Sequence, residues 1–289
     1  MALEGLHHIT AITADAPANV EFYTRVLGLR MVKKTVNFDA PDVYHLYYGD
    51  DGGTPGSLLT FFEFPGARIG RAGDGMIHRI VWRVRTQEAL GFWTERLGGG
   101  PIFSDGEGLD HELVVFDGPD EPLTAHVDDI PNEFAIQGFH AVRAYASEPD
   151  RSAALLDALG FSAPDENNAR RLGGDTREGF YIYDPPPHEL GLQGAGTVHH
   201  VAWSAADDAE LDGFRAIVSG AGAHPTPIID RQYFHSVYFR EPSHVLFELA
   251  SRDVGFTVDE PLETLGQDLK LPPQHEHLRS QLEQILTPL

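Results

Sequence analysis

The sequence predicts an α+β fold in which four βαβββ modules pair into two domains. Three features of the 289 residues support this prediction. An apolar, strand-like phrase containing histidine recurs four times, a helix-like segment that ends at glycine follows each phrase, and short β-rich runs follow each glycine. One such module leaves an apolar sheet face open to water, so the modules must pair to bury it.

The four opening strands are largely apolar, and each carries at least one histidine. We expect them at residues 6–13 (LHHITAIT), 77–84 (IHRIVWRV), 139–146 (FHAVRAYA) and 198–205 (VHHVAWSA). Their regular recurrence indicates repeated units of similar structure.

Each opening strand precedes a segment whose apolar residues return at three- and four-residue spacing, which is typical of an amphipathic helix. These helices are expected at 18–27, 87–97, 150–159 and 209–221, and glycine ends each one, as in VLGL, RLGG, ALGF and GAGA. The β-rich runs that follow are alternating or wholly apolar and are bounded by Gly, Pro and Asp. They are VYHLYYG, SLLTFFEF, HELVVFD, LTAHVDD, GFYIYD, SVYFRE and VLFELA.

The run DIPNEFAIQG, at about 129–138, separates the second module from the third. We therefore expect modules one and two in residues 1–133 and modules three and four in 134–255. Residues 256–289 form a tail in which prolines precede apolar residues at helical spacing (LPPQHEHLRSQLEQILTPL), and this pattern predicts a terminal helix.

Composition narrows the possible chemistry. The chain has no cysteine, so any metal must be held by nitrogen and oxygen donors. With 44 acidic against 21 basic residues the net charge is −23, which disfavours nucleic acid and anionic lipid as partners. We find no apolar run long enough to span a bilayer and no signal-peptide pattern, and we expect a cytoplasmic protein that can form homo-oligomers. A P-loop, a GxGxxG fingerprint and a GxSxG elbow are all missing, which argues against nucleotide-dependent and serine-hydrolase chemistry.

Aligning the four opening strands by hand places His8, Arg79, His140 and His200 at one equivalent position, directly before an apolar pair. A histidine at the start of a strand often serves packing alone, and we interpret His140 in this way because its module ends in GFYIYD without a matching carboxylate.

Aligning the closing strands sets Glu248, in VLFELA, against Thr60, in SLLTFF. A carboxylate within an apolar strand is costly to bury unless it is paired, and metal coordination is one remedy. His8, His200 and Glu248 would then form a two-histidine, one-carboxylate set that binds Fe(II) on one face and leaves positions open for substrate and O₂. A glutamate satisfied by arginine or by backbone donors is the alternative.

The combination of LHHIT, VYHLYYGD with GTPG, VHHVAW, DRQYFHSVYFRE and LFELA resembles the vicinal oxygen chelate superfamily, and within it the dioxygenases that cleave para-hydroquinones and catechols. The resemblance covers nearly the whole chain. It implies open β-barrel domains, a small aromatic diol and O₂ as substrates, and Fe(II) as the cofactor, with Mn, Zn or another divalent metal possible in the isolated protein. It assigns the metal to His8, His200 and Glu248.

The same resemblance assigns residues that line the active site. They are His7, Thr10, His199, Arg231 and Tyr238. Basic and hydrogen-bonding groups can stabilise the anion of an ionised diol. The alternatives are packing outside the barrel for His7 and His199, since neighbouring residues on a strand face opposite ways, a surface ion pair for Arg231 and a core position for Tyr238.

If His8 and His200 bind one ion, modules one and four must pair around it, and modules two and three must form the other domain. A glyoxalase-type isomerase is the nearest alternative function, but in that group two histidines and two glutamates hold the metal, and here Thr60 occupies the fourth position. Glu63 lies three residues further on, hence on the other face of the strand. A metal-free protein that binds an aromatic or drug molecule is the second alternative. The roles of His235 and His244, beside the closing strands, stay open.

Overall fold

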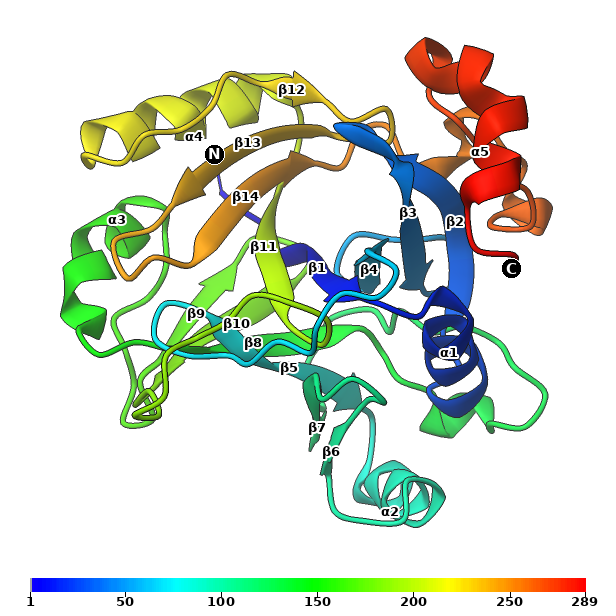
Figure 1. Cartoon of the computed structure of the whole chain (residues 1–289). Helices are drawn as coiled ribbons and strands as arrows, with labels where there is room; N and C mark the ends of the chain where they lie inside the picture. The colour runs from blue at the N-terminus through cyan, green and yellow to red at the C-terminus, as the bar shows by residue number, and fades with distance from the viewer. Residues whose placement is uncertain (1) are drawn as a thin grey trace.

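The computed structural model describes residues 2–289, which form two mixed β-sheets with helices on their outer faces (Figure 1). The larger sheet has eight strands in the order β12-β13-β14-β11-β1-β4-β3-β2 and curves into a half-barrel. Its strands are β1 (Leu6–Thr13), β2 (Arg30–Asn37), β3 (Ala40–Gly49), β4 (Leu58–Glu63), β11 (Val198–Ala205), β12 (Ile229–Asp230), β13 (His235–Arg240) and β14 (Leu246–Ser251).

The smaller sheet has six strands in the order β6-β7-β5-β8-β10-β9. These are β5 (Ile77–Val84), β6 (Ile102–Ser104), β7 (Asp110–Val115), β8 (Phe139–Tyr145), β9 (Ala169–Gly173) and β10 (Glu178–Asp184). The α-helices are α1 (Ala16–Val20), continued by a π-helical segment over Glu21–Val26, α2 (Gln87–Arg96), α3 (Ala153–Ala158), α4 (Asp208–Gly220) and, in the tail, α5 (Arg279–Ile285).

The pairing of modules follows the prediction. β1 of the first module runs antiparallel to β11 of the fourth, and β5 of the second runs antiparallel to β8 of the third. Each sheet is therefore built from two modules, and the strands nearest the two ends of the sequence lie together in the larger one. This arrangement confirms the α+β fold of paired modules.

The middle modules differ from the expected βαβββ pattern. Within the described residues only two strands follow α2 and two follow α3, and LTAHVDD (123–129) is not a strand. Residues 123–127 have no regular secondary structure, residues 128–129 lie in a turn, and the segment bonds to the loop after β3. The carbonyl of Thr124 accepts from the backbone N–H of Asp51, and the N–H of His126 donates to the Asp51 carboxylate. Its hydrogen bonds therefore tie two loops together instead of extending the smaller sheet.

The alternation of side chains along the central strands separates a core face from an inner face. On β1 and β11, Ile9, Val201 and Trp203 belong to the main hydrophobic core, whereas His8 and His200 point to the hollow of the half-barrel. All eight residues of β1 are buried, because this strand lies at the centre of the sheet and is covered on both faces. A polar cluster can therefore sit in the hollow, away from bulk water.

Among residues 2–289, no helix combines the length and the apolar character needed to cross a lipid bilayer.

Candidate metal centre

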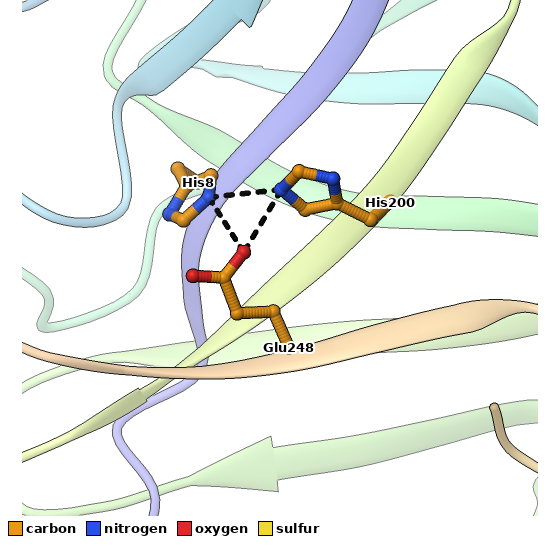
Figure 2. A group of neighbouring side chains, drawn as sticks. All are labelled: His8, His200 and Glu248. Carbon is orange, nitrogen blue, oxygen red and sulfur yellow. Dashed lines mark hydrogen bonds and ion pairs between the residues drawn. The ribbon is translucent and has the colours of Figure 1, made fainter. Parts of the chain in front are cut away.

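Three neighbouring strands bring His8, His200 and Glu248 together on the inner face of the larger sheet (Figure 2). Only 2%, 4% and 0% of their respective surfaces are exposed. The Nε2 atoms of the two histidines are 3.2 Å apart, and Glu248 Oε2 lies 3.1 Å from His8 Nε2 and 2.9 Å from His200 Nε2. The side chains thus present one nitrogen or oxygen atom each to a common centre.

The size of this triangle fits a metal ion. Ligands that are about 2.1 Å from a metal and at right angles to one another lie about 3.0 Å apart, whereas the separation in a tetrahedral site is about 3.4 Å. The observed sides of 2.9, 3.1 and 3.2 Å match the first arrangement, three ligands on one face of an octahedron. Such a set leaves the opposite face open to other ligands.

The carboxylate of Glu248 is only half satisfied by protein donors. Its Oε1 accepts a 2.5 Å hydrogen bond from the Ser236 hydroxyl, but its Oε2 is buried and has no hydrogen bond of suitable geometry within residues 2–289. A buried polar atom without a partner is costly, and a cation between the three side chains would remove that cost.

Hydrogen bonds fix the tautomer of His8. Its neighbour His7 is 1% exposed, and Nε2 of His7 lies 3.0 Å from the carbonyl of Ser251, which can only accept. Burial, followed by the charge of His8, lowers the pKa of His7 to about 3, so His7 is neutral and its Nδ1 is an acceptor. His8 Nδ1 must therefore donate across the 2.9 Å contact to His7 Nδ1, which leaves the lone pair of His8 Nε2 facing the centre.

His199 stands in a similar relation to His200, with 2.8 Å between their Nδ1 atoms. It differs from His7 in being exposed, and it lines the cavity in front of the three side chains. Although part of the residue is exposed, the protein around the imidazole desolvates it, and this effect together with the nearby charges of His200 and Arg240 lowers the pKa of His199 to about 4. A neutral imidazole is therefore available at the cavity wall.

Opposing effects act on the charge of Glu248. Burial favours the neutral acid, but the nearby imidazoles of His8 and His200, whose Nε2 atoms lie 3.1 and 2.9 Å from Oε2, outweigh it and hold the pKa of Glu248 well below its ordinary value. Burial lowers the pKa of His200, and Glu248 partly opposes this effect. An ionised carboxylate beside neutral imidazoles is the protonation state that binds a divalent cation.

A cavity of about 460 Å³ opens directly in front of the three side chains. Phe62, Phe64, Phe234 and Leu246 give it apolar walls, and the polar groups at its sides include Arg231 and Tyr238. Arg231 Nε donates to the Tyr238 hydroxyl over 3.3 Å, and its Nη1 donates to Asp39 over 3.0 Å. The cavity combines flat aromatic surfaces with a fixed cation, a combination suited to an aromatic anion.

The other residues singled out from the sequence lie close to this centre, but not all reach the cavity. His199, Arg231 and Tyr238 line it, whereas His7 lies behind His8 and Thr10 is fully buried, 2.8 Å from the hydroxyl of Thr60.

Sequence reasoning missed most of the apolar wall and also two polar residues on β3 that line the cavity, His45 and Tyr47. His45 Nε2 is 2.9 Å from the hydroxyl of Thr60, and His45 Nδ1 is 2.9 Å from that of Tyr47. Their spacing of two within VYHLYYG was the available signal, because alternate residues share a face of a strand.

The register of the sheets tests the hand alignment of the modules. Thr10 pairs with Thr60 in β1 and β4 just as Ala202 pairs with Glu248 in β11 and β14, so Thr60 does hold the position equivalent to Glu248. On the next strands, Tyr47 opposite Thr60 corresponds to Tyr238 opposite Glu248.

The alignment of His140 was wrong by one residue. Ile80 pairs with Val142 in the smaller sheet as Ile9 pairs with Val201 in the larger one, which makes Ala141 the equivalent of His200. His140 therefore corresponds to His199. Its ring packs against Phe180, with 4.7 Å between the centroids.

The two histidines left open by the sequence lie outside the walls of this cavity. His235 Nδ1 is 2.6 Å from the carboxylate of Asp208, at the start of α4. His244 is exposed in the turn between β13 and β14, where it has a positive φ of 79°.

Comparisons with known proteins agree with this description of the fold. Residues 5–100 and 75–249 match the model of the Glyoxalase/Bleomycin resistance protein/Dioxygenase superfamily. The chain is 38% identical to "Putative ring-cleaving dioxygenase MhqO" of Bacillus subtilis (strain 168), an alignment that covers 98% of this chain and 96% of that protein. It is 33% identical to "Chlorohydroquinone/hydroquinone 1,2-dioxygenase" of Sphingobium indicum, over 97% and 95% of the two chains.

Two solved structures extend the comparison. The crystal structure of a putative dioxygenase from Bacillus subtilis superposes with a TM-score of 0.92 at 38% identity and covers 100% of this chain and 98% of that one. Glyoxalase I of Zea mays superposes with a TM-score of 0.55 at 14% identity, over 86% and 92% of the two chains, and this likeness concerns the fold alone.

Proposed function

The chain belongs to the Glyoxalase/Bleomycin resistance protein/Dioxygenase superfamily, and we propose that it is an Fe(II)-dependent, extradiol-type dioxygenase that opens the ring of a hydroquinone or a catechol. The observation that carries this proposal is the triangle of His8, His200 and Glu248 at the base of an aromatic-walled cavity. Two imidazoles and one carboxylate on one face form the ligand set of non-haem Fe(II) oxygenases. The ring-cleaving relatives, similar over the whole chain, support the same reaction class.

In this proposal His8 Nε2, His200 Nε2 and Glu248 Oε2 hold the iron. The bound iron would supply positive charge to bind an ionised ring oxygen and a route for electrons between the ring and O₂. Ser236 fixes the carboxylate through Oε1, and His7 fixes the ring of His8, so both ligands are oriented in advance.

The remaining cavity residues act on the substrate. Phe62 and Phe234 provide the apolar walls against which an aromatic ring packs. Arg231 supplies a fixed positive charge for the substrate anion, and it orients the Tyr238 hydroxyl. With its Nε2 on the iron, His200 would donate through Nδ1 to Nδ1 of His199. The neutral His199 then carries its own hydrogen on Nε2, which has no hydrogen-bond partner among residues 2–289 and can donate to a ring oxygen of the substrate.

The position of Thr60 disfavours the alternative of a glyoxalase-type isomerase. Because Thr60 offers a hydroxyl where a second carboxylate would be needed, the metal would have only two imidazole ligands, one carboxylate ligand and an open face. The isomerase chemistry would need a second carboxylate as the fourth ligand. The half-satisfied carboxylate of Glu248 likewise disfavours a metal-free binding protein, which would gain nothing from burying it.

The test is anaerobic reconstitution with Fe(II), followed by oxygen uptake with hydroquinone, catechol and their chlorinated or methylated forms. We expect one O₂ consumed per molecule of at least one diol. His200→Ala should lose both iron and uptake, whereas His235→Ala, which removes a histidine from the same sheet but outside the cavity, should keep both. Full iron occupancy without uptake on any diol would contradict the proposal, and isomerisation of a thiol–aldehyde adduct would then favour the alternative.

A further inference from the structure

A continuous chain of hydrogen bonds crosses the inner face of the larger sheet beside the three ligand candidates. The hydroxyl of Thr10 is 2.8 Å from that of Thr60, which is 2.9 Å from His45 Nε2, and His45 Nδ1 is 2.9 Å from the hydroxyl of Tyr47. Thr10 and Thr60 are fully buried, whereas His45 and Tyr47 line the cavity. The chain therefore joins a dry interior at one end to the substrate cavity at the other.

The protons in this chain can be ordered in two directions. In the first, Tyr47 donates to His45, His45 donates to Thr60, and Thr60 donates to Thr10. The hydroxyl hydrogen of Thr10 is then left without an acceptor, because Thr60 is its one hydrogen-bond partner among residues 2–289. In the second, every donor is reversed, and the hydrogen left over belongs to the Tyr47 hydroxyl.

The second direction is favoured by its lower cost. An unpaired hydroxyl hydrogen in the dry interior costs about 1 to 3 kcal/mol, whereas one that faces the cavity can find water or a ligand. Burial lowers the pKa of His45 well below its ordinary value, which is consistent with the neutral imidazole that both directions require. Tyr47 is thus held as a hydrogen-bond donor toward the cavity.

The position of Tyr47 indicates which part of a ligand it meets. Tyr238, its counterpart in the fourth module, packs against a ligand candidate, with 5.8 Å between its ring centroid and that of His200. The ring of Tyr47 packs against the rings of His45, Tyr233 and Phe256, and among residues 2–289 neither imidazole of the ligand candidates is one of its ring partners. Tyr47 therefore stands further from the metal centre, on the side where Thr60 replaces a carboxylate.

From this placement we propose that Tyr47 is a substrate-binding residue that donates a hydrogen bond to the ring oxygen remote from the metal, and that His45 is a positioning residue that keeps Tyr47 a donor. The inference rests on the proposed function, since it takes an aromatic diol as the ligand. It adds to that function a basis for specificity: the Tyr47 hydroxyl would distinguish an aromatic diol from a phenol with a single ring oxygen.

The experiment measures binding without turnover. Iron-loaded protein is titrated calorimetrically, in the absence of O₂, with hydroquinone and with phenol, which lacks the second oxygen. We expect Tyr47→Phe to weaken hydroquinone binding on the order of tenfold, the loss that one hydrogen bond produces, and to leave phenol binding unchanged. Tyr48→Phe is the matched control: it removes a hydroxyl from the neighbouring residue, which faces the core and donates to Asn19, so the hydroquinone-to-phenol ratio should not change.

Variants of His45 separate positioning from packing. Leucine at this position cannot bond to Tyr47, so His45→Leu should lose the preference for hydroquinone as Tyr47→Phe does. His45→Gln can accept from Thr60 and donate to Tyr47 through its amide, and it should restore most of the preference. Iron content should stay stoichiometric in both variants.

Equal loss of affinity for both ligands in Tyr47→Phe, or no loss for either, would overturn the assignment of Tyr47. If the wild-type protein consumes O₂ with a diol and Tyr47→Phe still prefers hydroquinone over phenol as the wild type does, this inference fails while the proposed function stands. If the iron-loaded wild type binds neither ligand, the proposed function fails and this inference fails with it.

Discussion

Replacing Glu248 by glutamine changes one atom of the metal centre and should abolish high-affinity metal binding while the fold is kept. Glutamine retains an oxygen that can accept from Ser236, and its amide nitrogen would replace Oε2, next to Nε2 of His8 and of His200. Both imidazoles can accept from that amide, so the metal-free variant should be at least as stable as the metal-free wild type, in which the same site holds a buried charge.

The expected effect follows from linkage between metal binding and unfolding. At a free metal concentration one hundred times Kd, binding stabilises the wild type by about 2.7 kcal/mol. Mutating a residue that only hydrogen-bonds to a metal ligand weakens metal binding by up to about 100-fold, so loss of the charged ligand itself should weaken it at least that much. The same metal concentration then stabilises the variant by only about 0.4 kcal/mol. For a chain of this size, the metal should raise the Tm of the wild type by about 5 °C and that of Glu248→Gln by only about 1 °C.

The assay is differential scanning calorimetry with and without Fe(II) under argon, together with metal analysis of the protein. The control is Glu241→Gln, directly after β13, because Glu241 is also buried but its carboxylate is satisfied by Ser152, Tyr183 and the backbone N–H groups of Ser243 and Val245. This control should keep the metal-dependent shift. Stoichiometric iron in Glu248→Gln, with an unchanged shift in Tm, would refute the ligand role of Glu248.

Three further predictions test the surroundings of the centre. His7→Phe removes the acceptor for His8 Nδ1 and should weaken metal binding about 10- to 100-fold, measured by competition with a chelator, without loss of the fold; unchanged affinity would show that His8 needs no such support. Thr60→Glu places a carboxylate opposite Glu248, so it should bind metal at least as tightly but lose oxygen uptake, because the fourth ligand closes the face that substrate and O₂ need; full uptake would contradict this. Burial lowers the pKa of His111 to about 3. Between pH 6.5 and pH 3 the unfolded chain therefore binds more protons than the folded protein, so the contribution of His111 to the free energy of unfolding, complete above pH 6.5, is lost as the pH falls. His111→Phe should reduce that slope by about 1.4 kcal/mol per pH unit in urea denaturation of the metal-free protein, and parallel curves would rule out His111 as its source.

The repeated strands and helices could be predicted because each depends on a local pattern. The openings at 6–13, 77–84 and 198–205 coincide with β1, β5 and β11, and the helix predicted at 87–97 is α2 with one residue added. The segment LTAHVDD could not be judged in this way. It has the composition of a strand, but its backbone partners lie in the loop after β3, and contacts between such distant segments leave no local pattern.

Pairing of modules one and four was predictable because His8, His200 and Glu248 would otherwise have no common ion. The error at His140 was a slip of one residue in aligning FHAV with VHHV, made because a histidine was favoured at the ligand position; the ladder of hydrogen bonds places Ala141 there instead. His45 and Tyr47 were overlooked for a related reason: their role depends on which residues of β4 lie beside them, and this is a matter of register.

The candidate ligands come from positions 8, 200 and 248, which has a consequence for how the protein matures in the cell. During synthesis the first module cannot complete its sheet, because the fourth module, with which it pairs, is made last. The two middle modules can join in the meantime, since β5 and β8 are near neighbours in sequence. A metal ion should therefore be acquired only after synthesis has passed β14, so a protein truncated before this strand should fail to load metal even if its earlier strands have formed.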